Sequence, residues 1–246
     1  MAQPPTESPL LIVSDIMFHY GTAPALKAVT FALDAGQLVV LIGRNGAGKS
    51  TLLRCIAGWT GVDRGDIIIN AINARHDERR LRQQVILVPD TPPFYDELSA
   101  WEHLQFIAQL HALDNWRQDA EHLMRQLGVW LPREKSPLSF SRGMRYKLAL
   151  CAAFMVKPPL LLLDEPFGPL DPGAADTLWE MLTQYTADGM TVMLSSHALP
   201  NDAPPDSYVI LDRGEFIAQG TPGEIAPQFA THTPSLHQIL AVVLDG

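Results

Sequence analysis

The sequence predicts an α/β fold built around a parallel β-sheet. Short apolar runs with the strand pattern alternate with helical segments along most of the 246 residues, and this alternation favours parallel strands joined by helices. The octapeptide GRNGAGKS at residues 43–50 lies between an apolar run and a helical run. Strand, glycine-rich loop and helix, in this order, form the setting of the phosphate-binding loop G-x-x-x-x-G-K-[ST].

The elements follow one another in an order that suggests three parts. Strands are expected at residues 10–13, 28–33, 38–42, 66–70, 85–88, 160–163, 191–194, 208–211 and 215–218. Helices are expected at 50–58, 141–157 and 172–187, and within 96–131, where no strand pattern intervenes. We therefore expect one domain, with the sheet core and an antiparallel β subdomain at about 10–90 and 158–220, a helical subdomain at about 91–157, a short helical tail at 221–246, and disorder at 1–9.

The phosphate-binding loop predicts how a nucleotide is held. Its glycines allow a tight turn that brings backbone N–H groups close to phosphate at a helix N-terminus. Lys49 would reach the β- and γ-phosphates, and the hydroxyl of Ser50 would ligate Mg²⁺. The residues expected to bind nucleotide here are Gly43, Arg44, Asn45, Gly46, Ala47, Gly48, Lys49, Ser50 and Thr51. The alternative, a chance match in a glycine-rich turn, is disfavoured by the strand and helix on its two sides.

Composition limits the classes of protein and of partner. The chain is 47% hydrophobic and carries a formal net charge of −9, which predicts a large apolar core and argues against a nucleic-acid partner. The cysteines, Cys55 and Cys151, lie in apolar helical patterns without metal-ligand spacing and are expected to be free thiols in a reducing compartment. No signal peptide and no apolar run of about 20 residues is found. We expect a cytoplasmic protein that would reach a membrane only through a partner.

A second acidic motif follows the apolar run at 160–163. A buried strand would deliver Asp164 to the carboxyl end of the sheet, where ligands bind and where it would hold the hydration shell of Mg²⁺. Glu165 would be placed to polarise an attacking water. Taken by itself, this motif is equally compatible with a strand followed by an ordinary acidic turn.

Together, the two motifs give the chain a resemblance to the ATP-binding cassette (ABC) ATPases that covers essentially its whole length. The resemblance implies a P-loop NTPase core with a parallel sheet, an N-terminal antiparallel β subdomain and an inserted α-helical subdomain. Tyr20 resembles the aromatic residue on which these ATPases stack adenine. Asp90 stands where they usually have a glutamine that touches Mg²⁺. This departure would either supply a carboxylate ligand to Mg²⁺, directly or through water, or be a neutral substitution.

The segment FSRGM at residues 140–144 resembles the LSGGQ signature of the same family, although only its serine and second glycine remain. A competing alignment would begin the signature at Leu138. Spacing decides for Ser141, which precedes Asp164 by 23 residues, about the interval typical of the family. The form S-x-G-M is typical of ABC-2-type exporters. The resemblance implies that Ser141 and Gly143 bind the γ-phosphate of ATP held by a second protomer.

Two further positions are carried over from the resemblance. Asp171 corresponds to the loop that crosses the dimer interface near the nucleotide, and it also fits the N-cap of a helix that begins at Pro172. His197, after the strand at 191–194, corresponds to the switch histidine, which contacts the γ-phosphate and holds the attacking water in line. The expected catalytic residues are thus Glu165, His197 and Lys49.

The leading hypothesis is the ATP-binding and ATP-hydrolysing subunit of an ABC transporter, which uses ATP and Mg²⁺. It would dimerise with a like or unlike protomer around two ATP molecules and drive integral membrane subunits, with export favoured by the S-x-G-M form. Docking is expected near residues 90–104, where Phe94, Tyr95 and Trp101 could line a groove. For Trp101, packing inside the helical insert explains the sequence equally well.

Two other hypotheses stay open at this point. One is a single-cassette ABC ATPase that acts in macromolecular or cofactor assembly without a membrane partner. The other is a degenerate nucleotide-binding module without hydrolysis, which the presence of Lys49, Asp164, Glu165 and His197 disfavours. The transported substrate is not encoded in this chain, because specificity is expected to lie in the membrane subunits.

Overall fold

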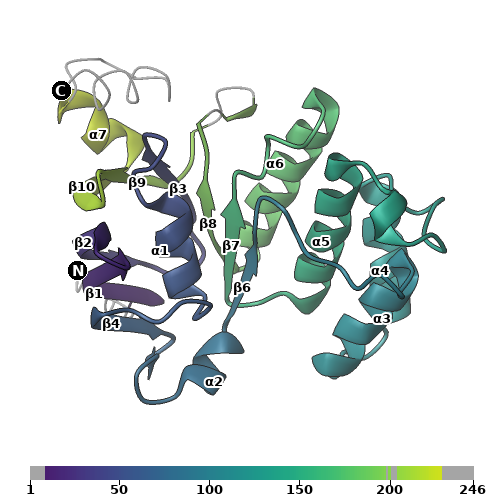
Figure 1. Cartoon of the computed structure of the whole chain (residues 1–246). Helices are drawn as coiled ribbons and strands as arrows, with labels where there is room; N and C mark the ends of the chain where they lie inside the picture. The colour runs from purple at the N-terminus through teal and green to yellow at the C-terminus, as the bar shows by residue number, and fades with distance from the viewer. Residues whose placement is uncertain (1–8, 198, 201–203, 229–246) are drawn as a thin grey trace, which may run out of the picture.

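The structure is a computed structural model, and it describes residues 9–197, 199–200 and 204–228. These residues form two β-sheets and a set of helices around them (Figure 1). The expected disorder at 1–9 falls outside the described residues except for Pro9. Of the expected helical tail at 221–246, residues 221–228 are described, and they include α7 (Pro222–Gln228).

The larger sheet has six strands in the order β10-β9-β3-β8-β7-β6. Its strands are β3 (Leu38–Gly43), β6 (Val85–Val88), β7 (Leu160–Asp164), β8 (Thr191–Ser195), β9 (Ser207–Asp212) and β10 (Glu215–Gly220). All neighbours from β9 to β6 pair in parallel, and β10 pairs with β9 in the antiparallel sense. Every residue of β3, β7 and β8 is buried, as expected for a parallel sheet that is covered on both faces. The predicted parallel sheet is confirmed.

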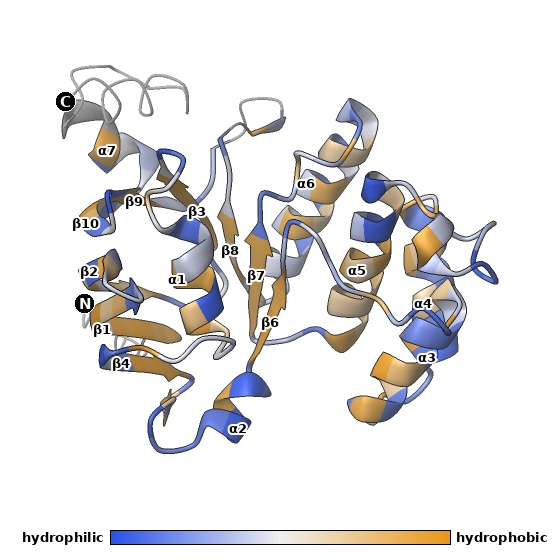
Figure 2. Cartoon of the chain, in the orientation of Figure 1, coloured by the Kyte–Doolittle hydropathy of each residue, from blue (hydrophilic) through white to orange (hydrophobic). Residues whose placement is uncertain are grey.

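Alternate residues of this sheet face two different apolar cores. Val40 and Ile42 of β3 pack in the core that includes α5 (Arg142–Val156) and α6 (Pro172–Ala187), whereas Val39 and Leu41 pack in the core that includes α1 (Lys49–Ile56). In Figure 2 the central strands are accordingly apolar along most of their length. The strand periodicity of two therefore places the sheet between a helical layer on one face and α1 with the smaller β-sheet on the other.

The smaller sheet is antiparallel, with the order β2-β1-β4-β5. It consists of β1 (Leu11–Tyr20), β2 (Ala23–Leu33), β4 (Arg64–Ile69) and β5 (Ile72–Asn73). β1 and β2 are longer than predicted. Register shifts interrupt their pairing, and Asp15 and Ala28 adopt left-handed backbone with φ of 52° and 56°. These irregularities break the alternation of apolar and polar residues, so the sequence pattern revealed only part of each strand.

A mainly helical region lies between β6 and β7. It contains α3 (Ala100–Leu110), α4 (Trp116–Gln126), the short 3₁₀ helix η1 (Pro137–Ser139) and α5. Ser99 and Glu102 form a capping box that begins α3. Trp101 packs against Trp116 and Trp130, with ring centroids 5.0 and 5.7 Å apart. Trp101 therefore belongs to the packing of this region.

A short helix and two cysteines complete the description of the fold. The short helix α2 (Glu78–Arg82) carries its three basic side chains, Arg79, Arg80 and Arg82, on the surface. Cys55 and Cys151 are buried free thiols, and burial raises the pKa of Cys55 to about 12. Among the described residues, no helix is both long enough and apolar enough to span a membrane.

Candidate functional site

The phosphate-binding loop joins β3 to α1 at the carboxyl end of the sheet (Figure 1). Gly48 precedes α1 with a φ of 100°, and no side chain caps this helix N-terminus. A Cβ atom at Gly48 would lie 2.7 Å from the carbonyl oxygen of Ala25, and one at Gly43 would lie 2.3 Å from that of Leu211. Glycine is therefore required at both positions, and the first N–H groups of α1 are left for an anion.

Lys49 is the buried cation of the loop. Its Nζ atom donates to the carbonyl oxygens of Gly43 at 2.9 Å and Arg44 at 3.3 Å, and lies 3.8 Å from Oε1 of Glu165. Burial lowers the pKa of Lys49, while Glu165 and Asp164 act in the opposite direction. The ammonium thus lies inside the loop, where it can meet a phosphate.

Asp164 ends β7 and is connected to two hydroxyl groups. The hydroxyl of Ser50 donates to Oδ1 of Asp164 at 3.0 Å, and that of Ser195 donates to the same atom at 2.8 Å. Ser195 also accepts a 2.9 Å hydrogen bond from the backbone N–H of Glu165. Ser195, which is fully buried at the end of β8, belongs to none of the sequence motifs described above. The sequence signal that could have revealed it is a polar residue at the end of an otherwise apolar strand pattern.

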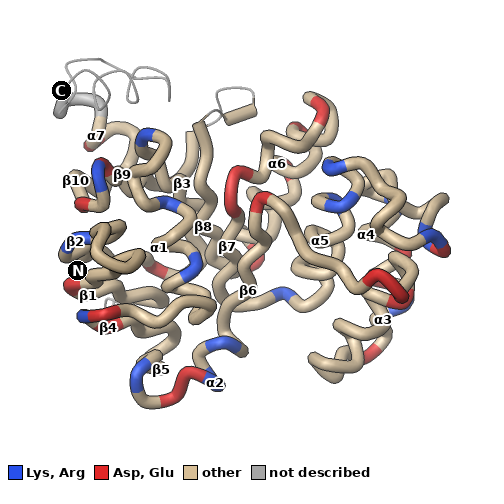
Figure 3. Tube along the Cα trace, viewed as in Figure 1, with Lys and Arg blue, Asp and Glu red and all other residues tan. Residues whose placement is uncertain are grey.

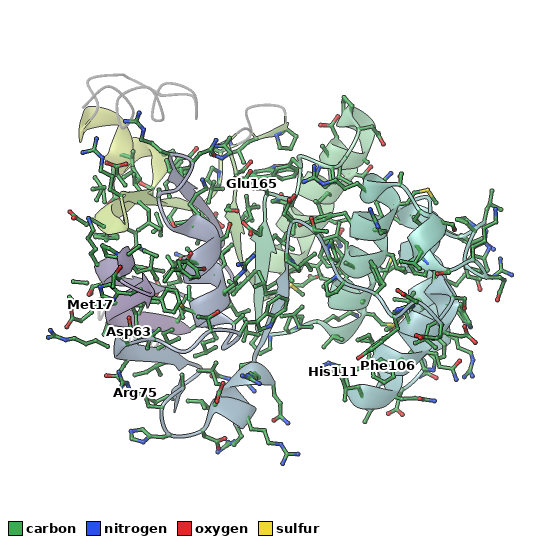
Figure 4. All side chains as sticks on the ribbon, viewed as in Figure 1. Met17, Asp63, Arg75, Phe106, His111 and Glu165 are labelled. Carbon is green, nitrogen blue, oxygen red and sulfur yellow. The ribbon has the colours of Figure 1, made fainter. Side chains whose placement is uncertain are left out.

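Glu165 and His197 face each other above the ends of β7 and β8, and Figure 4 labels Glu165 there. Nε2 of His197 lies 2.9 Å from Oε1 of Glu165 and 3.3 Å from Nζ of Lys49. Burial raises the pKa of Glu165, and burial together with Lys49 lowers the pKa of His197. Glu165 also has a φ of 48°, unusual for a residue with a side chain. This arrangement favours a neutral imidazole that donates its Nε2 proton to the carboxylate.

These groups surround a cavity of about 660 Å³. The expected site residues that line it are Tyr20, Arg44, Asn45, Gly46, Gly48, Lys49, Ser50, Thr51, Asp90, Glu165 and His197. The side chain of Tyr20 is half exposed, and its hydroxyl lies 3.2 Å from that of Thr51. Gly43, Ala47, Asp164, Ser141, Gly143 and Asp171 are not among the lining residues. Of these, Asp164 is connected to the cavity by its hydrogen bond from Ser50, a residue that lines the cavity.

Ser141 is the N-cap of α5 and Gly143 is its second residue, and neither lines this cavity. The hydroxyl of Ser141 caps α5 by accepting from the N–H of Met144 at 3.2 Å. A Cβ atom at Gly143 would lie 2.6 Å from the carbonyl oxygen of Pro169, so glycine is needed for the close approach of α5 to the loop after β7. This packing role is separate from the phosphate contact that the sequence suggested.

Asp171 caps α6, which is one of the two roles expected for it from the sequence. Its Oδ1 atom accepts from the N–H of Ala174 at 3.0 Å, and Nζ of Lys147 lies 3.5 Å from Oδ2. These contacts lower the pKa of Asp171. The carboxylate is exposed beside the start of α5, a position compatible with an interface role as well.

Asp90, which follows β6, forms an ion pair with the guanidinium of Arg142, the first residue of α5. Both side chains line the cavity. Figure 3 shows acidic stretches at the ends of β6 and β7 and basic stretches at the facing end of α5. The sequence placed Asp90 near Mg²⁺ but assigned no role to Arg142.

Comparison with known proteins identifies the family. Residues 26–168 match the family described as "ABC transporter". The chain belongs to this family. It is 35% identical over 233 residues to the ABC-type transporter ATP-binding protein EcsA of Bacillus subtilis, covering 94% of each chain. It is also 30% identical over 227 residues to the linearmycin resistance ATP-binding protein LnrL of Bacillus subtilis, covering 91% of this chain and 73% of LnrL.

Solved structures agree with this assignment. A structure described as the ATP binding subunit of an ABC transporter has 36% sequence identity and a TM-score of 0.89, covering 96% of this chain and 99% of that one. The chain is therefore an ABC ATPase with the P-loop NTPase fold, and an ATP-binding, ATP-hydrolysing subunit of the transporter type. A role as an assembly ATPase without a membrane partner is not favoured.

Proposed function

We propose that two protomers of this type close around two ATP molecules and that their closure and reopening drive membrane-embedded subunits. The observation that carries the proposal is the meeting of Lys49, Glu165 and His197 at one cavity beside the phosphate-binding loop. Ser141 and Gly143, which lie outside that cavity, would cover the ATP of the facing protomer. Tyr20 would stack on the adenine, and Asp171 would approach the interface.

Mg²⁺ fits the oxygen atoms at this site. The hydroxyl of Ser50 and the carboxylate of Asp164 are 3.0 Å apart, and both are hard ligands of the kind Mg²⁺ prefers. Among the described residues, no three His, Cys, Asp or Glu side chains form a metal cage. Mg²⁺ is usually held by one or two carboxylates together with substrate phosphates, so Ser50 and Asp164 would be sufficient protein ligands. Asp90 is the further candidate ligand.

The hydrolytic step would depend on Glu165 and His197. Glu165 would accept a proton from the attacking water, and burial raises its pKa toward the range useful for a base. His197, neutral and bonded to Glu165, would hold the water and contact the γ-phosphate. Lys49 would neutralise charge on the transferred group.

An apolar groove of about 550 Å³ between α3, α5 and the segment after β6 is our candidate for membrane-subunit docking. Phe94, Tyr95 and Phe106 line it, and the side chains of Tyr95 and Phe106 are 58% and 41% exposed. His103 accepts a 2.9 Å hydrogen bond from the N–H of Tyr95, which fixes this edge of the groove. Trp101 is not among the lining residues.

We further propose the division into a core with a β subdomain at about 10–90 and 158–220 and a helical subdomain at about 91–157. A peripheral position on the cytoplasmic face of the membrane and export as the direction complete the proposal. EcsA and LnrL are named as transporter and resistance ATP-binding proteins, which supports a membrane partner.

Co-purification tests the partner directly. The chain, expressed with an affinity tag in its own cells and extracted in mild detergent, should retain an integral membrane protein. A Tyr95→Ala, Phe106→Ala variant should lose that protein while it keeps ATP binding. Recovery of the native chain without any membrane protein, together with an ATPase activity confined to the soluble fraction, would contradict the proposal.

A further inference from the structure

The Asp90–Arg142 ion pair connects two parts of the fold at the edge of the nucleotide cavity. Asp90 follows a strand of the parallel sheet, whereas Arg142 begins α5. The guanidinium donates to Oδ1 of Asp90, and both residues line the same cavity as Lys49 and Ser50. The pair therefore borders the space in which the proposed function puts the phosphates of ATP.

The pair is too weak to serve as a rigid brace. The side chains of Arg142 and Asp90 are 54% and 40% exposed, and an ion pair at such a position shifts an equilibrium by only about 1.4- to 5-fold. A guanidinium binds phosphate through paired, charge-assisted hydrogen bonds, which contribute a factor of about 10 to 150. A triphosphate would thus compete successfully with the single carboxylate of Asp90.

The position of Arg142 on its helix makes a neighbouring anion favourable. A cation in the first turn lies at the positive end of the helix dipole, so Arg142 gains from any neighbouring anion. In the structure Asp90 is that anion. A phosphate that entered the cavity would satisfy Arg142 and would leave the Asp90 carboxylate free for a different cation.

We propose that Arg142 is a phosphate-binding residue that Asp90 holds until ATP binds. The inference rests on the proposed ATP site and deepens it. Arg142 leaves Asp90 for a phosphate group when nucleotide enters the cavity. The phosphate belongs either to ATP on the loop of the same chain or to ATP on a second copy of the chain.

The test compares Arg142→Gln with Arg64→Gln, both in a Glu165→Gln chain, which is expected to bind ATP without turnover. Arg64 pairs with Asp15 at 2.8 Å and is similarly exposed, but it does not line the cavity. A fluorescent ATP analogue with Mg²⁺ is titrated into the dilute, monomeric chain. Sedimentation velocity at saturating ATP then measures dimer formation, and thermal melting confirms that each variant is folded.

Two results support a phosphate contact and distinguish its source. If Arg142 binds ATP on its own chain, Arg142→Gln weakens nucleotide affinity of the dilute chain by about 10- to 150-fold. If it binds ATP on a second copy, that affinity is unchanged and dimer formation weakens by the same factor. The proposal is overturned if neither quantity changes more than it does in Arg64→Gln.

A double-mutant cycle tests the role of Asp90. If Asp90 competes with phosphate, Asp90→Asn favours binding about 1.4- to 5-fold more when Arg142 is present than in the Arg142→Gln background. Loss of a Mg²⁺ ligand would affect both backgrounds alike and so cancels. Equal effects of Asp90→Asn would refute the competition. If Glu165→Gln with native Arg142 forms no ATP-dependent dimer, the ATP sandwich is wrong, while the affinity of the dilute chain still decides the role of Arg142.

Discussion

Replacement of Ser195 by alanine tests whether this hydroxyl holds the catalytic acids in place. Ser195→Ala removes the 2.8 Å bond to Asp164 and leaves the N–H of Glu165 without the oxygen that it meets at 2.9 Å. A hydrogen bond to a charged group contributes about 1.5–3 kcal/mol, and an unpaired buried N–H costs about 1–3 kcal/mol. Because the two effects share one atom and are not additive, we expect a net loss of about 2–4 kcal/mol.

The measurements are thermal unfolding and ATP turnover. For a chain of this size the expected loss lowers the melting temperature by roughly 4–16 °C. Turnover should fall at least about tenfold, because Glu165 depends on Ser195 to keep its strained backbone. Thr186→Val is the control, since Thr186 is also a buried hydroxyl but donates to Thr183 within α6. It should cost about 1 kcal/mol and leave turnover unchanged. If Ser195→Ala matches this control in both measurements, the reasoning is wrong.

Three further predictions follow from the same geometry. The buried hydroxyl of Tyr146 has no hydrogen-bond partner in the described part of the chain, so Tyr146→Phe should leave the free energy of unfolding unchanged or raise it by up to about 1–3 kcal/mol; a lower melting temperature would contradict this prediction. Because the pKa of Glu165 is raised in the folded state, protonation of Glu165 stabilises the native fold. This contribution is complete below the ordinary pKa of 4.5, and it is lost as the pH rises through the pKa of Glu165 in the folded state. Glu165→Gln should therefore gain stability relative to the native chain as pH rises, in denaturant titrations across this range; a difference independent of pH would contradict it. Asp90→Gln should shift the Mg²⁺ concentration for half-maximal ATPase activity if Asp90 is a ligand; an unchanged rate and Mg²⁺ dependence would show that it is not.

The sequence predicted the parts of the fold that depend on local pattern. The phosphate-binding loop and the apolar strand before Asp164 each carry their signal within a few residues. The loop, the strand β3 before it and the strand β7 before Asp164 were therefore located from the sequence. β1 was foreseen only in its first residues, because the left-handed turn at Asp15 interrupts the alternation of its side chains. The bounds of β2 were missed for a similar reason at Ala28.

The candidate site was predictable where motif and chemistry coincide, as for Lys49 and Glu165. Contacts between distant segments were not. Ser195 gains its role because β8 lies beside β7, and Arg142 gains its partner because α5 begins near the end of β6. Both depend on strand order and helix placement, which no single stretch of sequence contains.

Glu165→Gln tests the central claim, that this cavity is a motor site shared by two protomers, most directly. With ATP and Mg²⁺, the native chain should hydrolyse ATP and sediment mainly as a monomer. Glu165→Gln should bind ATP, lose turnover by at least about 100-fold and accumulate as a nucleotide-bound dimer, because closure without hydrolysis cannot be reversed. A Glu165→Gln chain that still hydrolyses ATP, or that binds ATP and stays monomeric, would contradict the account.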